Sequence, residues 1–449
     1  MNIFQNSIAR FQKISGIDFH ILATILFRGW GVLAGSITVV LLPIWLTPSE
    51  QGYYFTFGSI LGIQIFFELG LNQIVMQLVS HEVSHLHEDE CGQFVGHTIH
   101  LDKISSLVAM NNRWYAIAAI LFALICGILG IFFFPKKELS SDVAWLGIWL
   151  ILVGVTAVNL WFSPKLAVME GLGRVGYVAR LRLLQSIVGY LILWMALYFG
   201  AGLWVSLVVP LAAALCSYYW LRFRATQLLW LSQREFSPMN RINWRNDVFP
   251  LQWRIGLSWA SGYLIFSLFT PMVFINQGPV AAGQLGVALA IFASISAVGM
   301  SWIGAKVPNF VLHIAKGDKK NLDLLFKHLL IRSTIMIFIC AISFLGIVQY
   351  LTYLNLEIVR RLVPLDVLVL LAIATIVNSL IFGMATYMRA HREEPMLLQS
   401  IMVGILTALA VYFGSRYGIF TMIFLYMLIC VFISLPWTLW LYKKYYIKK

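Results

Sequence analysis

Long apolar runs alternate with short polar segments along the whole chain. Twelve runs have about 20 residues each, the length that an α-helix needs to cross the hydrocarbon core of a bilayer. Strands of a membrane barrel would instead show alternating segments of about 10 residues. The pattern therefore predicts an all-α polytopic membrane protein with about twelve transmembrane helices, at residues 21–46, 52–79, 114–134, 143–162, 183–199, 203–221, 255–275, 283–303, 329–351, 365–388, 397–413 and 418–441.

The predicted spans form two sets of six, separated by a longer basic segment. This layout is typical of transporters built from two repeats related by an axis normal to the membrane. A weak repeat supports it, because Arg28 precedes Pro43 by 15 positions and Arg254 precedes Pro271 by 17. We predict two six-helix bundles related by pseudo-two-fold symmetry, with the substrate between them. The predicted parts are an amphipathic N-terminal segment (1–20), an N-terminal bundle (21–223), a cytoplasmic linker loop (224–251), a C-terminal bundle (252–441) and a basic tail (442–449).

The charged residues indicate the orientation of the spans. Only 11% of the residues are charged, against about 25% in soluble domains. Of the 32 lysines and arginines, 26 lie on the side that holds both termini and 5 on the other. Because basic loops stay in the cytoplasm, we predict a multi-pass membrane protein with both termini cytoplasmic. The net charge of +13 follows from this topology and from contact with anionic lipid, so no nucleic acid partner is expected.

The loops weigh against an enzyme. The predicted extracytoplasmic loops are too short to fold alone, and the sequence has no GxxxxGK(S/T) phosphate-binding loop. We therefore predict no catalytic residues, no ATP hydrolysis and no cofactor. Four of the five cysteines lie in apolar runs and Cys91 lies in a loop, so no disulfide is expected.

Arg28 is the most informative single residue, because a charge inside an apolar span is costly and usually faces a cavity or a partner. It lies about 10 Å from the predicted cytoplasmic end of its span. One interpretation is an arginine that extends to the headgroups. The other is a binding residue for an anion, because the guanidinium fork fits phosphate oxygens.

Glu68 is the only acid well inside a predicted span, with Gln64 and Asn72 one turn away on either side. This polar stripe is consistent with an ion-coupling site that carries a proton or another cation. It is equally typical of hydrogen bonds between helices that fix packing, which is the interpretation we favour.

Other polar residues lie within or at the ends of spans. Arg254 and Lys306 lie at predicted cytoplasmic ends, where together with Arg28 they would give a positive entrance that attracts pyrophosphate. The predicted substrate-binding set is Arg28, Trp30, Asn159, Arg254, Gln284, Lys306 and Asn378.

The segment 81–100 holds five of the nine histidines together with Cys91 and several acids. His81 and His85 share a helical face, but no CxxC or HExxH pattern is present. We predict a solvated amphipathic connector and no metal site.

Several short motifs resemble one known family. They are LTPSEQGYY at 46–54, FELGL at 67–71, MEGLGRV at 169–175, GPVAAGQLG at 278–286 and RAHREEP at 389–395. In order and position they resemble the bacterial translocases (flippases) of O-antigen and related polysaccharide repeat units, in the multidrug/oligosaccharidyl-lipid/polysaccharide exporter superfamily. The superfamily often has aspartate at the position of Glu68, which also favours a structural role for this residue.

The resemblance implies a V-shaped pair of bundles that moves an undecaprenyl-pyrophosphate-linked oligosaccharide to the periplasmic leaflet by alternating access. Arg28 would pair with the pyrophosphate, Trp30, Trp161 and Trp259 would stack on sugars, and Glu68 would couple transport to protons. The bilayer, the lipid-linked oligosaccharide, the polymerase and the chain-length regulator are the partners it implies.

Three alternatives remain open. A cation-coupled drug or small-molecule antiporter of the same superfamily would be expected to gather more acids within the spans. A membrane component of polysaccharide polymerisation would be an enzyme, which the short loops disfavour. A scaffold for a glycan assembly complex is the third.

Overall fold

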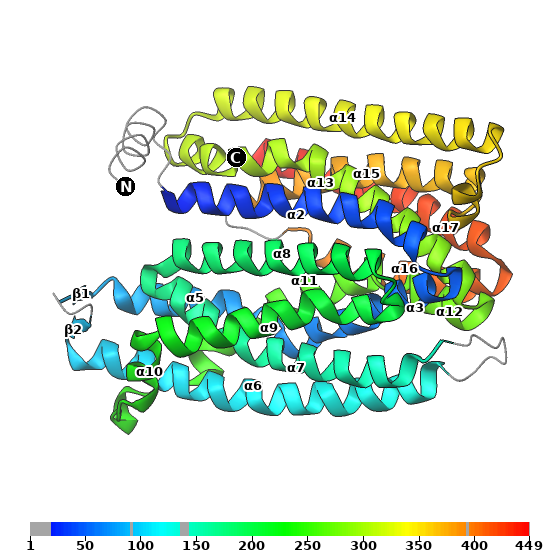
Figure 1. Ribbon diagram of the computed structural model, residues 1–449. Helices are drawn as coiled ribbons and strands as arrows, with labels where there is room; N and C mark the ends of the chain where they lie inside the picture. The colour runs from blue at the N-terminus through cyan, green and yellow to red at the C-terminus, as the bar shows by residue number, and fades with distance from the viewer. Residues whose placement is uncertain (1–18, 90–92, 135–142, 392–394, 449) are drawn as a thin grey trace, which may run out of the picture. The chain divides into compact units, whose positions relative to one another are not determined.

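The computed structural model of the 449-residue chain describes residues 19–89, 93–134, 143–391 and 395–448 (Figure 1). The described chain is helical apart from one antiparallel pair of short strands. The predicted amphipathic segment 1–20 lies almost wholly outside the described residues. The elements are α2 (Phe19–Trp45), α3 (Pro48–Leu61), η1 (Gly62–Gln64), α4 (Ile65–Glu68), α5 (Leu71–Val83), β1 (Leu86–Glu88), β2 (Phe94–Gly96), α6 (Thr98–Phe133), α7 (Trp145–Met169), η3 (Glu170–Arg174), α8 (Val175–Tyr198), η4 (Gly202–Trp204), α9 (Val205–Arg224), α10 (Thr226–Gln233), η5 (Pro238–Asn240), η6 (Trp244–Val248), α11 (Phe249–Phe266), α12 (Phe269–Gln277), α13 (Pro279–Ala315), α14 (Lys319–Tyr353), η7 (Glu357–Arg361), α15 (Leu365–Ala390), α16 (Leu397–Tyr417), α17 (Ile419–Leu428), η8 (Ile429–Ser434) and α18 (Leu435–Lys448).

Each of the twelve predicted spans falls mainly on helix, with short breaks at Leu69–Gly70 and Ser267–Leu268. Within the described ranges, nine helices are long and apolar enough to cross a membrane, or ten if the bent pair Pro48–Glu68 and Leu71–Val83 is one span. One of the nine, Trp145–Tyr198, has 54 residues, about 80 Å of helix at 1.5 Å per residue, and covers two predicted spans. A break at Gly173, with φ of 83°, divides it. The nine helices account for all twelve predicted spans once Trp145–Tyr198 is counted as two, the bent pair is counted as one and α2 is added. This confirms the predicted fold class.

Contacts divide the chain into two compact units. The first unit consists of Met1–Ala34, Gln64–Ile131 and Ala144–Gly256, and the second of Gly35–Ile63, Phe132–Val143 and Leu257–Lys449. In the first unit α9 packs against α7 and α8, and α5 packs against α7. In the second unit α13 packs against α3, α14 and α15. This division follows packing and not chain order, and the boundaries drawn from the sequence stay a prediction.

The motifs that resemble the flippase family lie where helices begin, end or break. Thr47 caps α3: its side chain accepts from the Glu50 backbone N–H at 3.2 Å, and the Glu50 carboxylate accepts from the Thr47 N–H at 2.9 Å. This reciprocal capping box, followed by Pro48 at the first helical position, fixes the start of the helix. α13 also begins with a proline, Pro279, which follows Gly278 with φ of 91°, but it has no side-chain cap.

Two glycines let α3 and α13 approach closely within the second unit. A Cβ on Gly52 would lie 1.9 Å from the Pro279 carbonyl oxygen, and one on Gly283 would lie 2.8 Å from the Gly52 nitrogen. Small residues are what permit such backbone contact between membrane helices. The aromatic rings of Tyr53 and Phe274, 5.0 Å apart, pack beside this contact.

Candidate functional site

Asn72 is the centre of a polar network inside the first unit. Its Nδ2 donates to Ser163 Oγ on α7 at 2.6 Å and to Glu68 Oε2 on α4 at 3.2 Å. The buried hydroxyl of Tyr115 on α6 donates to Asn72 Oδ1 at 3.0 Å. The network therefore joins four helices through one amide. It places Glu68 and Asn72 together, as the sequence spacing predicts, and gives the Glu68 carboxylate a defined partner.

The chain between Glu68 and Asn72 is not helical. Leu69 and Gly70 both adopt left-handed conformations, with φ of 44° and 70°, so α4 ends and α5 begins at a sharp break. The start of α11 packs on this break, because a Cβ on Gly70 would lie 2.2 Å from Ile255 Cγ2. A left-handed leucine costs about 1–2 kcal/mol. The break is thus a strained feature directly beside Glu68.

Trp30 lies on α2, with its ring 6.1 Å from Trp194 on α8, and Trp194 lies 6.3 Å from Tyr190. These rings form an aromatic row in the first unit. The Trp30 indole N–H is buried and meets no acceptor among the described residues. Arg28 is in the same helix, but its side chain lies outside the described part of the structure, as does that of Arg254 in α11.

Two predicted substrate-binding amides donate to backbone carbonyls. Asn159 Nδ2 bonds the Pro210 oxygen on α9 at 2.9 Å, and Gln284 Nε2 bonds the Arg360 oxygen in η7 at 2.8 Å. These bonds join helices or hold a loop and engage the amide nitrogens, so the amide oxygens are the atoms with which either residue could contact a substrate while the bonds persist. Lys306 is exposed on α13, about 33 Å along the helix from Gln284. That the predicted residues line one shared cleft stays a prediction.

Asn378 lines a cavity of about 380 Å³ in the second unit. Its Nδ2 donates to the Tyr426 hydroxyl at 2.8 Å. The rest of the wall is apolar or weakly polar, including Phe266, Phe292 and Met300, and holds no aspartate, glutamate, lysine or arginine. The cavity therefore offers no carboxylate to a cation.

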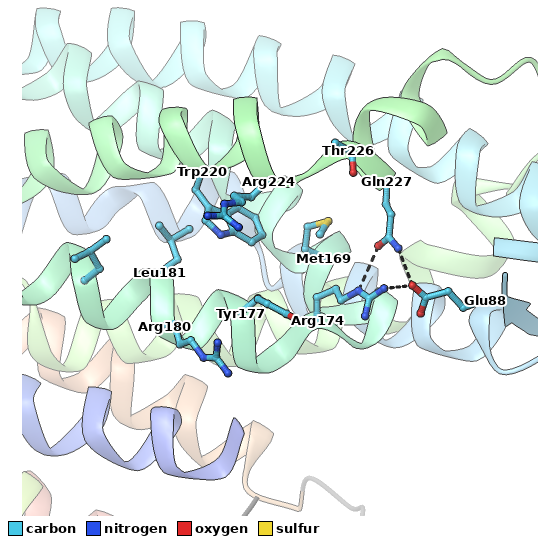
Figure 2. A pocket seen from close by; sticks show the side chains of 11 residues that line it. Glu88, Met169, Arg174, Tyr177, Arg180, Leu181, Trp220, Arg224, Thr226 and Gln227 are labelled. Carbon is cyan, nitrogen blue, oxygen red and sulfur yellow. Dashed lines mark hydrogen bonds and ion pairs between the residues drawn. The ribbon is translucent and has the colours of Figure 1, made fainter. Parts of the chain in front are cut away.

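A second cavity, which we call the arginine cavity, lies in the first unit and has a volume of about 630 Å³. Figure 2 shows Glu88, Arg174 and Gln227 meeting at one end, with Trp220 and Arg224 toward the other. This site was missed from the sequence because its arginines were interpreted as topology signals. A usable signal was present: Arg174, Tyr177, Leu181 and Leu184 recur at i, i+3, i+7 and i+10, which is one face of a helix.

The histidine-rich segment folds around one carboxylate. The Glu82 carboxylate lies 2.6 Å from His100 Nδ1, 3.3 Å from Lys103 Nζ and 3.4 Å from His81 Nδ1. His85 stacks on His100 at 4.6 Å. In the part of this segment that the structure describes, no three His, Cys, Asp or Glu side chains are arranged to hold a metal ion. The cluster anchors the base of the β1–β2 hairpin.

Comparison with known proteins identifies the fold. No family model matches the sequence, and no curated protein is similar to it. Among solved structures, an inward-facing multidrug resistance MATE family transporter of the MOP superfamily superposes with a TM-score of 0.62 and 11% identity, over 96% of this chain and 99% of that one. The chain therefore has the fold of these membrane transporters.

Two further structures agree with this assignment. The lipid II flippase MurJ, in an inward closed conformation, superposes with a TM-score of 0.61 and 12% identity, over 96% of this chain and 89% of that one. The MATE multidrug transporter DinF-BH gives 0.57 and 12%, over 95% of each chain. At these identities the likeness establishes the architecture alone. The similar structures include multidrug transporters and a lipid II flippase, so the choice of substrate rests on the residues.

Proposed function

We propose that this chain is a flippase that moves undecaprenyl-pyrophosphate-linked oligosaccharide repeat units, of O-antigen or a related surface polysaccharide, from the cytoplasmic to the periplasmic leaflet. Alternating access between two bundles, with coupling to an ion, is the proposed mechanism. The fold shared with a lipid II flippase supports it. A sugar-pyrophosphate head does not cross hydrocarbon unaided, because its charges and hydroxyls lose their hydration there.

The observation that carries the proposal is how few acids lie in or near the spans and how they are engaged. Glu68, the only acid well inside a predicted span, accepts a hydrogen bond from Asn72, and Glu170, in η3 between two predicted spans, pairs with Arg182 at 3.1 Å. The cavity of the second unit is lined by no carboxylate. An antiporter of organic cations needs carboxylates that are free to bind them. These acids are poorly placed for that task, which favours an anionic substrate.

In this proposal Arg28, within α2, pairs with the pyrophosphate, and Arg254 and Lys306 give the entrance its positive charge. The aromatic row that includes Trp30 supplies a stacking surface for sugars. Asn159, Gln284 and Asn378 stay candidate substrate contacts, and Glu68 the candidate coupling residue. The proposed setting is the bacterial inner membrane with both termini cytoplasmic, alongside the polymerase and chain-length regulator of the same pathway.

The test is a deletion strain complemented with the wild-type gene, in which the leaflet location of lipid-linked repeat units is measured together with surface polysaccharide. We expect single units to accumulate on the cytoplasmic leaflet without the gene, and Arg28→Ala to behave like the deletion at normal protein level. Arg245→Ala, at an exposed position in η6, is the matched control. Unpolymerised units on the periplasmic leaflet of the deletion strain would instead place the protein in polymerisation. Inhibition of transport by an organic cation would favour the antiporter.

A further inference from the structure

The arginine cavity carries an excess of positive charge. Arg174 at the start of α8, Arg180 within α8 and Arg224 at the end of α9 line it, against one acid, Glu88. Arg224 is exposed and forms no ion pair with any acid that the structure describes. An arginine that lines a cavity beside an aromatic ring, here Trp220, is well suited to recognise a phosphate group.

Glu88 occupies the position that an anion would take. Arg174 Nη2 forms an ion pair with Glu88 Oε1, and Gln227 Nε2 donates to the same oxygen at 3.2 Å (Figure 2). Arg174 Nε in turn donates to Gln227 Oε1 at 3.4 Å, which orients the amide. A guanidinium and an amide that converge on one carboxylate oxygen offer the donors that a phosphate oxygen accepts.

The Glu88 carboxylate is placed so that a stronger anion can displace it. It lies in β1 of the two-stranded hairpin and not in a membrane span, and its side chain is 37% exposed. The hairpin is held at its base, where Leu86 pairs with Gly96, independently of the ion pair with Arg174. Loss of that ion pair therefore need not unfold the hairpin.

Part of the remaining wall of the arginine cavity is apolar. Met169, Leu181 and Leu184 lie beside the arginines. The volume of about 630 Å³ falls within the range of about 300–1,000 Å³ that is usual for small-molecule sites. A charged rim over an apolar wall suits a ligand with a phosphate head and a hydrocarbon portion more than a free inorganic anion.

We propose that the arginine cavity binds the phosphate or pyrophosphate head of an amphiphile, and that Glu88 is a built-in competitor for Arg174. The inference goes beyond the proposed function, because it holds whether the amphiphile is the transported lipid or a resident phospholipid. Binding moves the guanidinium of Arg174 from the carboxylate to the phosphate and leaves the hairpin free of this contact.

The experiment uses the purified full-length chain in nanodiscs of phosphatidylcholine. Binding is measured by titration with inorganic pyrophosphate and, separately, with phosphatidic acid incorporated into the discs. We expect Arg224→Gln to weaken binding of phosphatidic acid about tenfold and Glu88→Gln to strengthen it about tenfold, since each changes one charge-assisted contact. Arg222→Gln is the matched control: it removes the same charge from the same helix, at an exposed position outside the cavity.

Opposite effects of the two variants are not produced by misfolding, which lowers binding in both. Binding of phosphatidic acid with or without binding of pyrophosphate supports the proposal, and the pyrophosphate titration tells whether the head alone suffices. Binding of pyrophosphate without phosphatidic acid would overturn it, as would equal affinities for Arg224→Gln, Glu88→Gln and Arg222→Gln. Because this assay needs no transport, failure of the flippase proposal leaves it unaffected.

Discussion

The break beside Glu68 can be tested with a single methyl group. Gly70 has φ of 70° and faces Ile255, so that a Cβ would lie 2.2 Å from Ile255 Cγ2. In Gly70→Ala two costs add. A left-handed residue with a Cβ costs about 1–2 kcal/mol, and forcing one carbon into a filled space costs about 1–3 kcal/mol. We expect Gly70→Ala to lower the free energy of unfolding by about 2–5 kcal/mol.

Gly173 is the matched control for the first of these costs. It also has a left-handed backbone, with φ of 83°, but nothing lies within 4 Å of the position that a Cβ would take there. Gly173→Ala should therefore cost only about 1–2 kcal/mol. The assay is thermal unfolding of the purified chain at one fixed detergent concentration, because the detergent affects the midpoint.

A double-mutant cycle isolates the second cost. In an Ile255→Ala background the clashing methyl is gone, so Gly70→Ala should lose about 1–3 kcal/mol of its effect and approach the cost measured for Gly173→Ala. If Gly70→Ala is no more costly than Gly173→Ala, or if Ile255→Ala leaves its cost unchanged, then α11 does not pack on the break as described.

Three further substitutions probe the hydrogen bonds. Asn72→Ala leaves the buried Tyr115 hydroxyl without its acceptor and should destabilise by about 1–3 kcal/mol, measured by the same unfolding assay. Glu68→Gln keeps an oxygen to accept from Asn72 and should destabilise less than Asn72→Ala. Transport that persists in Glu68→Gln assigns Glu68 to packing, and loss of transport assigns it to coupling. Hydrogen bonds from Asn321 lower the pKa of Asp318, which caps α14. A lowered pKa stabilises above about pH 3.9, so the difference in unfolding midpoint between wild type and Asp318→Ala should be constant near neutral pH and vanish as the pH falls below that value.

The number and kind of elements follow from the sequence because each span is a local property. A run of about 20 apolar residues has to be helical in lipid, whatever its neighbours are. The break at Leu69 and Gly70 did not follow in the same way. The run 52–79 holds four glycines besides its polar stripe, and a glycine in a span predicts a close approach as readily as a left-handed turn.

Contacts between distant segments were not predictable. Gly52 and Gly283 each begin a predicted span, but nothing in the sequence shows that their helices touch. Likewise, Glu88 and Arg174 are 86 positions apart and meet only because a hairpin brings one to the end of a helix that carries the other. Such pairs depend on tertiary packing, which a hydropathy pattern does not encode.

The same reasoning explains why residue type alone did not reveal the arginine cavity. A polar side chain in lipid must find a partner, and helices supply one in backbone carbonyls and neighbouring amides. Asn72 and Asn159 are engaged in this way. Arginines at the ends of helices face no such demand, so Arg224 can keep its donors for a ligand. Because the topology rule places arginine at the same helix ends, residue type there does not distinguish an orientation signal from a binding site, and only the cavity does.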